Sequence, residues 1–166
     1  MVKYFKTAVL LAALVLLGVL LWRHYFPNNE KLIRKMLSGL AQDISVPEKS
    51  KTFAKLTAAD SVPSYFTPDA EIDVDMPEIG RHTINGRQEI AQTALAAQTQ
   101  LPGLRVEFRD VAIRIDVTKE TATSELTAKV TLPGQREFEM QVVRLSLSKY
   151  NGDWRIAKAE TVRAFK

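Results

Sequence analysis

Hydrophobic positions follow two different periods along the chain. Between residues 29 and 97, apolar residues recur mainly three or four positions apart, as they do on a helix with one buried face. From residue 104 onward, apolar and polar residues alternate, as they do on a strand with one buried face. The pattern therefore predicts a largely helical first part followed by a long antiparallel sheet.

Three helices are expected in the first part. The first begins at Asn28 or Asn29, whose side-chain oxygen can accept a hydrogen bond from the first turn. The second covers roughly residues 48–60, and the third begins at Asn85, which has the spacing of a capping box with Gln88. The predicted apolar faces consist of Leu32, Ile33, Met36, Leu37, Leu40, Ile44, Phe53, Leu56, Ile90, Ala91, Ala94 and Leu95, with Gln98 next in line.

Alternation of apolar and polar residues predicts six strands. The first alternates apolar and acidic residues over 71–76, and the second is the short sequence Arg-His-Thr-Ile at 81–84. Asn151 and Gly152 favour a type I′ hairpin turn before the last strand, because both residues can adopt positive φ. The four long strands are predicted at residues 104–117, 121–132, 137–149 and 154–162.

Two phase changes interrupt the alternation, and each is typical of a β-bulge. One lies at Arg109 and Asp110, and the other lies between Val142 and Val143. Bulges bend a sheet, and the three helices can then cover its concave face. The expected fold class is α+β: a cone-shaped, curved antiparallel sheet packed on three helices and preceded by a single transmembrane helix.

The transmembrane helix is predicted from the sixteen uncharged residues 7–22, between Lys6 and Arg23. A helix of this length is about 24 Å long, slightly less than the roughly 30 Å hydrocarbon core of a bilayer. Aromatic residues lie on both flanks, where an interfacial belt is expected. The chain is thereby divided into a tail with a signal anchor, residues 1–27, and one domain, residues 28–166.

Two other interpretations of the hydrophobic run stay open. A cleaved signal peptide also begins with basic and then apolar residues, but it needs small residues at the cleavage site, and here the chain continues LLWRHYFP. The run could also be a buried helix of a soluble protein. Basic residues on both sides leave the orientation undecided, but a short tail before a long domain is typical of a signal anchor. We therefore expect a single pass through the inner (cytoplasmic) membrane, with the domain on the periplasmic face.

Composition excludes several classes of function. The chain has no cysteine, which excludes disulfides and thiolate metal sites. Its formal net charge of +4 is scattered without a basic stripe, so nucleic-acid binding is not expected. The sequence has no metal-ligand spacing, nucleophile motif or phosphate loop, so we expect neither a metal nor a cofactor.

Two stretches resemble the SnoaL-like branch of the nuclear-transport-factor-2-like superfamily. YFTPDAEIDVDMPEIGRHTINGRQEI, residues 65–90, resembles the acidic strand, short strand and helix start of that branch. KYNGDWRIAKAETV, residues 149–162, resembles its closing hairpin. The resemblance covers roughly residues 29–163 and implies a cystatin-like cone. The superfamily includes isomerases, dehydratases, epoxide hydrolases, polyketide cyclases and non-enzymatic binding or assembly domains, so the fold does not select a function.

Enzymes of this superfamily place an Asp, His, Tyr or Asn inside the cone, where burial tunes it for proton transfer. In this chain the expected inward positions are apolar apart from Ser124, which predicts a filled interior. Those positions are Val106, Phe108, Val111, Ile113, Ile115, Ala122, Ser124, Leu126, Ala128, Val130, Phe138, Met140 and Val142.

His82 with Asp73 or Asp75 is the candidate catalytic pair. His82 equally fits a surface position on a short strand. The two aspartates share one strand face about 7 Å apart, which also fits a solvated edge.

Tyr65, Asp110 and Trp154 are the candidate ligand-binding residues. A bulge can turn a side chain toward a site, which makes Asp110 a candidate. The two aromatic residues fit the rim of a core equally well.

The sequence favours a membrane-tethered, non-enzymatic domain that binds a partner protein or a small apolar ligand at the cell envelope. A SnoaL-like lyase or isomerase with a His/Asp pair, and an envelope assembly subunit, are the alternatives. The expected partners are the lipid bilayer, through residues 7–22, and an unknown protein or small ligand. A homodimer is also a candidate, through the sheet face that places Lys129 beside Glu139 and Gln141, although the charges there favour a transient contact.

Overall fold

One six-stranded sheet, covered on one face by helices, forms the domain. The computed structural model describes residues 28–46, 60–76, 80–134 and 138–162. No helix in this part of the chain is long and apolar enough to cross a membrane. The predicted anchor at 7–22 lies outside the described residues, as does most of the predicted helix at 48–60.

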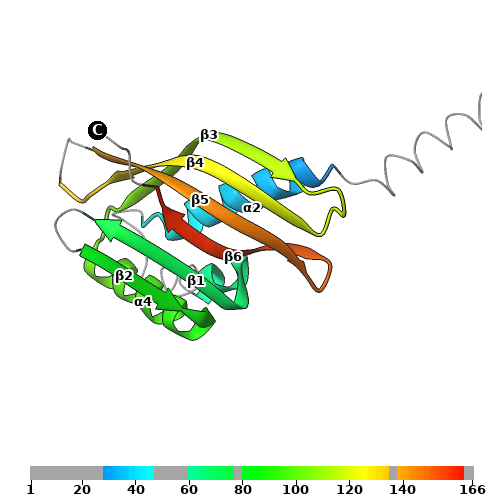
Figure 1. Ribbon diagram of the computed structural model, residues 1–166. Coiled ribbons are helices and arrows are strands. Elements are labelled where there is room, and N and C mark those ends of the chain that lie inside the picture. The colour runs from blue at the N-terminus through cyan, green and yellow to red at the C-terminus, as the bar shows by residue number, and fades with distance from the viewer. Residues whose placement is uncertain (1–27, 47–59, 77–79, 135–137, 163–166) are drawn as a thin grey trace, which may run out of the picture.

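The strands form a sheet in the order β2-β1-β6-β5-β4-β3 (Figure 1). All neighbouring strands are antiparallel except β1 and β6, which run parallel in the middle of the sheet. The last four strands therefore pair consecutively, as the alternating pattern predicts. Their bounds are β1 Phe66–Met76, β2 Gly80–Asn85, β3 Arg105–Ile115, β4 Thr121–Thr131, β5 Phe138–Tyr150 and β6 Asp153–Thr161.

Two α-helices lie behind the sheet in Figure 1, α2 (Asn29–Ile44) near β3, and α4 (Gly86–Gln100) near β1 and β2. A short 3₁₀ helix, η1 (Val62–Tyr65), leads into β1. We call the sheet face toward the helices the inner face, and the opposite one the outer face. The core between the layers contains Ile33, Leu37, Leu40, Val62, Phe66, Ala70, Ile90, Ala122, Leu126, Leu145, Leu147, Trp154, Ile156 and Ala159. The predicted α+β cystatin-like architecture is confirmed, with two described helices where three were expected.

The helix caps differ in detail from the prediction. Asn28 caps α2 as expected, its Oδ1 accepting a hydrogen bond from the Lys31 amide at 3.3 Å. Asn85 precedes α4, but its side chain makes no capping bond. Its main-chain N–H instead donates to Glu89 Oε2 at 2.7 Å. The predicted partner Gln88 is therefore wrong, because Glu89, one residue further on, accepts this hydrogen bond. The apolar faces are also narrower than predicted, since Leu32 and Leu95 are exposed.

The predicted bulge in β3 is confirmed. The register with β4 shifts between Arg109 and Ala112, and Asp110 there has a φ of 51°. The extra residue keeps Phe108 and Val111, which have opposite parity, packed against the same core.

The predicted bulge in β5 is wrong. β4 and β5 pair without interruption from Thr121↔Ser148 to Thr131↔Phe138. Leu145 and Leu147 are buried on the inner face, so this register turns Phe138, Met140 and Val142 outward with Lys129. Phe138 and Met140 are 49% and 55% exposed, and the Lys129 Nζ lies 4.4 Å from the Phe138 ring centroid.

The same register places Glu139 and Gln141 on the inner face. Glu139 is paired with Val130, and Gln141 with Ala128, both of which have the inward parity of β4. The sequence predicts that Ser124 is the only polar residue of the inner face. This prediction is wrong, because Glu139 and Gln141 share that face. The charged outer face expected to bring Lys129 beside Glu139 is instead partly apolar at this end. The homodimer predicted there stays a prediction.

The bulge residue allows a direct test of the backbone conformation. We expect Asp110→Val to lower the free energy of unfolding by about 1–2 kcal/mol, because a β-branched residue fits positive φ poorly. Asp110→Gly should leave stability unchanged or raise it. Thr123→Val, at an exposed and regular position of β4, is the matched control and should be near neutral. Thermal or denaturant unfolding measures all three, and an equal effect of Val at both positions would contradict the bulge.

Candidate functional site

The inner face of the sheet is apolar over most of its described length. Its buried side chains include Leu126 of β4, Leu145 of β5 and Ile156 of β6. Ser124 lies among them, as predicted, and is 1% exposed. Its hydroxyl has no hydrogen-bond partner within the described part of the chain, so no base is in place to activate it as a nucleophile.

A polar cluster lies where α2, η1 and α4 meet. Tyr65 donates its hydroxyl hydrogen to Asp43 Oδ2 at 2.7 Å, which joins η1 to the last turn of α2. Gln98 of α4 is buried and donates its Nε2 hydrogen to the main-chain oxygen of Asp43 at 2.9 Å. Gly39 leaves room for this arrangement, because a Cβ at that position would lie 2.8 Å from the Tyr65 hydroxyl oxygen. The predicted ligand residue Tyr65 is thus tied into a contact between helices.

The environment of Tyr65 keeps its phenol protonated. Burial is the largest cause, followed by the hydrogen bond to Asp43 and the negative charge of that carboxylate, and together they raise the pKa of Tyr65 to about 12. At neutral pH this side chain is a hydrogen-bond donor with its hydrogen already committed to Asp43. It is therefore poorly suited to act as a general base.

The structure does not bring His82 together with the two aspartates. His82 of β2 pairs with Val74, whereas Asp73 pairs with Thr83 and Asp75 pairs with Arg81. Directly paired residues share a sheet face and neighbours alternate, so His82 lies on the opposite face from both carboxylates. His82 is exposed. A His/Asp pair needs both groups within hydrogen-bond reach, and this register separates them.

Asp73 is engaged by Arg81 on the outer face. The Arg81 Nε lies 2.9 Å and 3.0 Å from the two carboxylate oxygens, and its NH2 group also donates to Asp73. These hydrogen bonds hold the pKa of Asp73 below its usual range. Asp73 is only 8% exposed beneath this guanidinium. Its carboxylate is therefore satisfied by a fixed partner rather than solvated at an edge.

The two other predicted ligand residues lie in different surroundings. Trp154 is buried in the core, and its Nε1 donates to Asn29 Oδ1 at 3.3 Å. Asp110 is exposed at the bulge of β3. Neither residue lines the groove described next.

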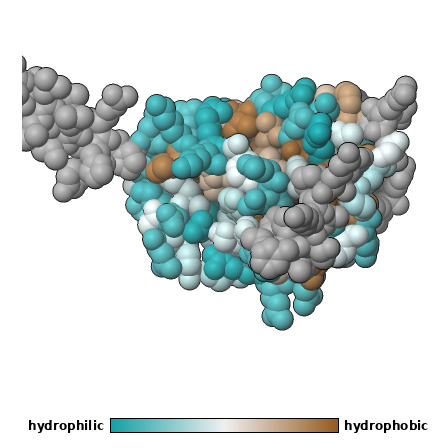
Figure 2. All heavy atoms as spheres, turned by 180° about the vertical axis from the view of Figure 1, so that it is seen from behind, coloured by the Kyte–Doolittle hydropathy of each residue, from teal (hydrophilic) through white to brown (hydrophobic). Residues whose placement is uncertain are grey.

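A groove of 420 Å³ runs between α2 and β3. Figure 2 shows the domain from behind, with a few hydrophobic side chains among hydrophilic ones in its upper half. α2 and β3 lie in the upper half of the domain in Figure 1. The polar residues of the groove are largely engaged: Arg34 pairs with Glu30 at 2.9 Å, and Glu107 pairs with Arg109 at 2.8 Å. The groove is lined by Arg34, Leu37, Ser38, Ala41, Gln42, Val106, Glu107, Phe108 and Val111.

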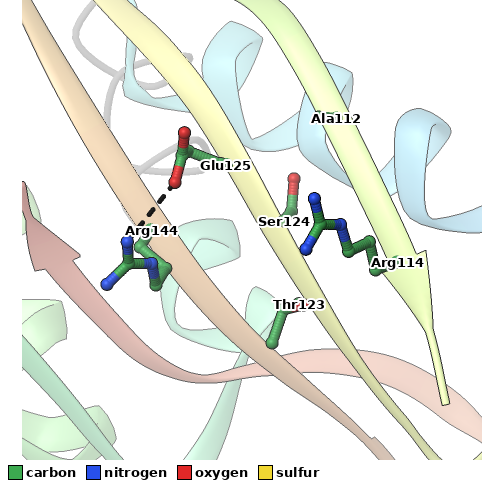
Figure 3. A pocket seen from close by; sticks show the side chains of 6 residues that line it. All are labelled: Ala112, Arg114, Thr123, Ser124, Glu125 and Arg144. Atoms are coloured by element: carbon green, nitrogen blue, oxygen red, sulfur yellow. Dashed lines mark hydrogen bonds and ion pairs between the residues drawn. The ribbon is translucent and has the colours of Figure 1, made fainter.

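A second hollow, of 260 Å³, lies across β3, β4 and β5 (Figure 3). Arg144 projects into it and pairs with both Glu125 and Glu160 at 3.4 Å. These three side chains are about half exposed, and ion pairs of this kind contribute little free energy. The hollow is lined by Ala112, Arg114, Thr123, Ser124, Glu125 and Arg144.

A third hollow, of 460 Å³, lies beside the Asp73–Arg81 pair and includes Asp75 and Glu160. No group of three or more His, Cys, Asp or Glu residues in the described segments is arranged to hold a metal ion.

Two features of the site have no clear signal in the sequence. Asp43 lies off the apolar stripe of α2, and nothing in its spacing marks it as the partner of Tyr65. The α2–β3 groove depends on how a helix sits beside an edge strand, which periodicity does not specify. Gln98 is different, because its position in line with Ile90 and Ala94 indicated a buried amide.

The comparisons with known proteins agree with this geometry. A family model described as a SnoaL-like domain matches residues 57–160. No curated protein is detectably similar to the chain in sequence.

Solved structures share the fold at low sequence identity. A domain of unknown function with a cystatin-like fold from Nostoc punctiforme has a TM-score of 0.64 and 21% identity, over 85% of this chain and 80% of that one. A candidate aromatic ring hydroxylase from Novosphingobium aromaticivorans has a TM-score of 0.65 and 13% identity, over 83% and 90%. A candidate scytalone dehydratase from the same organism has a TM-score of 0.59 and 16% identity, over 81% and 84%.

At these identities the structural likeness establishes the fold alone. The family match is broader evidence, because it covers more than half of the chain, with all of the first stretch that carries the resemblance and most of the second. The chain belongs to the SnoaL-like domain family.

Proposed function

We propose that this chain is a membrane-tethered, non-enzymatic SnoaL-like domain that binds a small apolar ligand in the α2–β3 groove. The groove itself is the observation that carries the proposal. Its volume of 420 Å³ lies within the range of about 300–1,000 Å³ usual for ligand pockets. Its floor is formed by Leu37, Val106, Phe108 and Val111.

The charges at the rim of the groove support an uncharged ligand. Arg34 is neutralised by Glu30, and Glu107 by Arg109, before any ligand arrives. A charged ligand would therefore find no unpaired charge on either of these two side chains. An apolar ligand needs only the floor, with Ser38 and Gln42 available for a hydrogen bond at the rim.

The polar groups of the inner side support a role without catalysis. Acid–base catalysis requires a titratable group within reach of a substrate and with a pKa near the working pH. Tyr65 and Asp43 bond to each other, and the raised pKa of Tyr65 removes it from that range. His82 and the two aspartates lie on opposite faces of the β1–β2 ribbon.

The tether is part of this proposal and rests on the sequence. Residues 7–22 have the length, apolar character and flanking aromatics of a signal anchor. With that anchor, the domain would be held at the periplasmic face of an inner membrane. Apolar ligands are concentrated in such membranes, so a tethered apolar groove would lie next to their source.

Ser38 provides a test of the groove. It is exposed and lines the groove, so the indole of Ser38→Trp should occupy the ligand volume without disturbing the core. Native mass spectrometry of the full chain, released from detergent, should show a co-purifying apolar molecule on the wild type and a loss of most of it in the variant.

Gln92→Trp is the matched control, because it adds the same side chain at an exposed position of α4 that does not line the groove. It should retain the bound molecule. A wild type that carries no such molecule, or a Ser38→Trp variant that keeps it, would contradict the proposal.

A SnoaL-like lyase or isomerase is the second candidate. The names of the hydroxylase and dehydratase among the structural neighbours favour it, and the Tyr65–Asp43 pair on the inner side is the place where it can be tested. Conversion of the co-purified molecule on incubation with the wild type, and its loss in Tyr65→Phe, would favour this candidate over a binding role.

The Tyr65–Asp43 bond also predicts a pH dependence of stability. A hydrogen bond to a charged group contributes about 1.5–3 kcal/mol, so Tyr65→Phe should be less stable by that order at pH 7. The folded pKa of about 12 exceeds the unfolded value of 10, so the contribution is fully present below pH 10 and is lost as the pH rises toward 12. Thermal unfolding of the full chain should show the two proteins converging over that window. Tyr150→Phe, at an exposed hairpin end, is the control, and a constant difference would refute the bond.

A further inference from the structure

The turns of the hairpins β3–β4 and β5–β6 lie at the end of the domain where α2 begins. Trp154, at the beginning of β6, bonds to Asn29 of α2. The main-chain N–H of Lys149, near the end of β5, donates to the main-chain oxygen of Glu120 at 2.9 Å. This bond joins the turn at 116–120 to the same end of the domain. Figure 1 shows the β3–β4 and β5–β6 turns at the end of the sheet where α2 begins.

Three exposed apolar side chains lie on this end of the domain. Val117, in the β3–β4 turn, is 95% exposed, and Leu32 in the first turns of α2 and Tyr150 at the end of β5 are 44% and 39% exposed. At this exposure the Val117 side chain contributes nothing to the hydrophobic core. Turns favour Gly, Pro, Asn, Asp and Ser, so a β-branched apolar residue is uncommon at this position.

Basic residues accompany these apolar side chains. Lys31 and Lys35 lie one turn apart on the exposed side of α2, and neither has an ion-pair partner among the residues that the structure describes. Of the nearby acidic residues, Asp116 beside Val117 accepts hydrogen bonds from Thr118, and three others have basic partners. Glu30 pairs with Arg34, Glu120 with Lys149, and Asp153 with Arg155.

The length of the connection limits how far this end can lie from a bilayer. Five residues, 23–27, lie between Trp22, at the end of the hydrophobic run, and Asn28, the cap of α2, so six Cα–Cα steps join the two. At about 3.5 Å per step, these six steps reach at most about 20 Å. A domain of about 140 residues has a radius of gyration of about 14 Å, so the tether is shorter than the domain is wide. If residues 7–22 span the membrane, the start of α2 always lies within about 20 Å of it.

We propose that this end, formed by Lys31, Leu32, Lys35, Val117 and Tyr150, is a docking surface for an anionic lipid bilayer. The inference rests on the tether of the proposed function and not on the groove. Val117, Leu32 and Tyr150 enter the interfacial layer, while the two lysines contact lipid phosphates. Each lysine near an anionic surface raises the affinity about fivefold, and a covalent tether makes even weak docking effective.

The absence of cysteine makes a direct test possible, because a single introduced cysteine carries the only label. The full chain with Val117→Cys is spin-labelled and placed in nanodiscs of phosphatidylcholine with phosphatidylglycerol. The accessibility of the label is measured with oxygen, which enters lipid, and with a water-soluble nickel chelate. Phe138→Cys is the matched control: it is also an exposed apolar position, and it lies about 40 Å away along β5.

We expect the nickel accessibility at position 117 to be severalfold lower than at position 138, with higher oxygen accessibility. Adding Lys31→Glu and Lys35→Glu, or using phosphatidylcholine alone, should return position 117 to the value of the control. Acidic residues in the first turns of a helix are well tolerated, so this variant should stay folded. Protection that survives both changes would overturn the role of the lysines.

Failure of the docking surface and failure of the tether give different results. A label at position 117 that is as accessible to nickel as the one at position 138, in chains that resist alkaline extraction from the membrane, would overturn the docking surface alone. Release of the chain by alkaline extraction would overturn the tether and with it this inference.

Discussion

The unbroken pairing of β4 with β5 is the constraint on which the rest of the structure depends. Because side chains alternate along a strand, eleven consecutive pairs determine the face of every residue in both strands. They bury Leu126 and Leu145 against the helices and turn Phe138 and Met140 outward. A shift of one residue would exchange these sets and expose the core. The adjustments that the curved sheet needs are therefore made elsewhere, in β3, β1 and β6.

The bulge in β3 connects this constraint to the proposed site. It keeps Phe108 and Val111 on the same side of the strand although they have opposite parity. Both side chains then line the groove against α2. The helix has several roles at once: one stripe fills the core through Ile33 and Leu40, another side forms the groove, and its first turn begins the domain. α2 thus contributes both to the groove and to the proposed membrane-facing end.

Much of the fold could be predicted from the sequence, because periodicity reports which side of an element is buried. The order of the elements, the bulge at Asp110 and the inward Ser124 all follow from it. The predicted bulge in β5 failed for a physical reason. Adjacent apolar residues such as Val142 and Val143 do not reveal which of them faces outward, and the stem of Lys129 can cover an exposed ring such as that of Phe138.

The site was less predictable than the fold, because it depends on distances between segments far apart in the chain. His82 and Asp73 are nine residues apart and looked like a pair, yet the register of one short hairpin places them on opposite faces. Tyr65 and Asp43 are bonded across 22 residues, with nothing in the sequence to connect them. Family membership indicates the fold but does not determine the function, which depends on how individual side chains such as these are placed.

The central claim is that the α2–β3 groove, and not the inner polar cluster, holds a ligand. An experimental structure of the full chain with its co-purified molecule tests this most directly. The account predicts the molecule between α2 and β3, in contact with Leu37, Phe108 and Val111. A molecule bound instead against Tyr65 and Asp43, with their hydrogen bond broken, would contradict it and favour an enzyme.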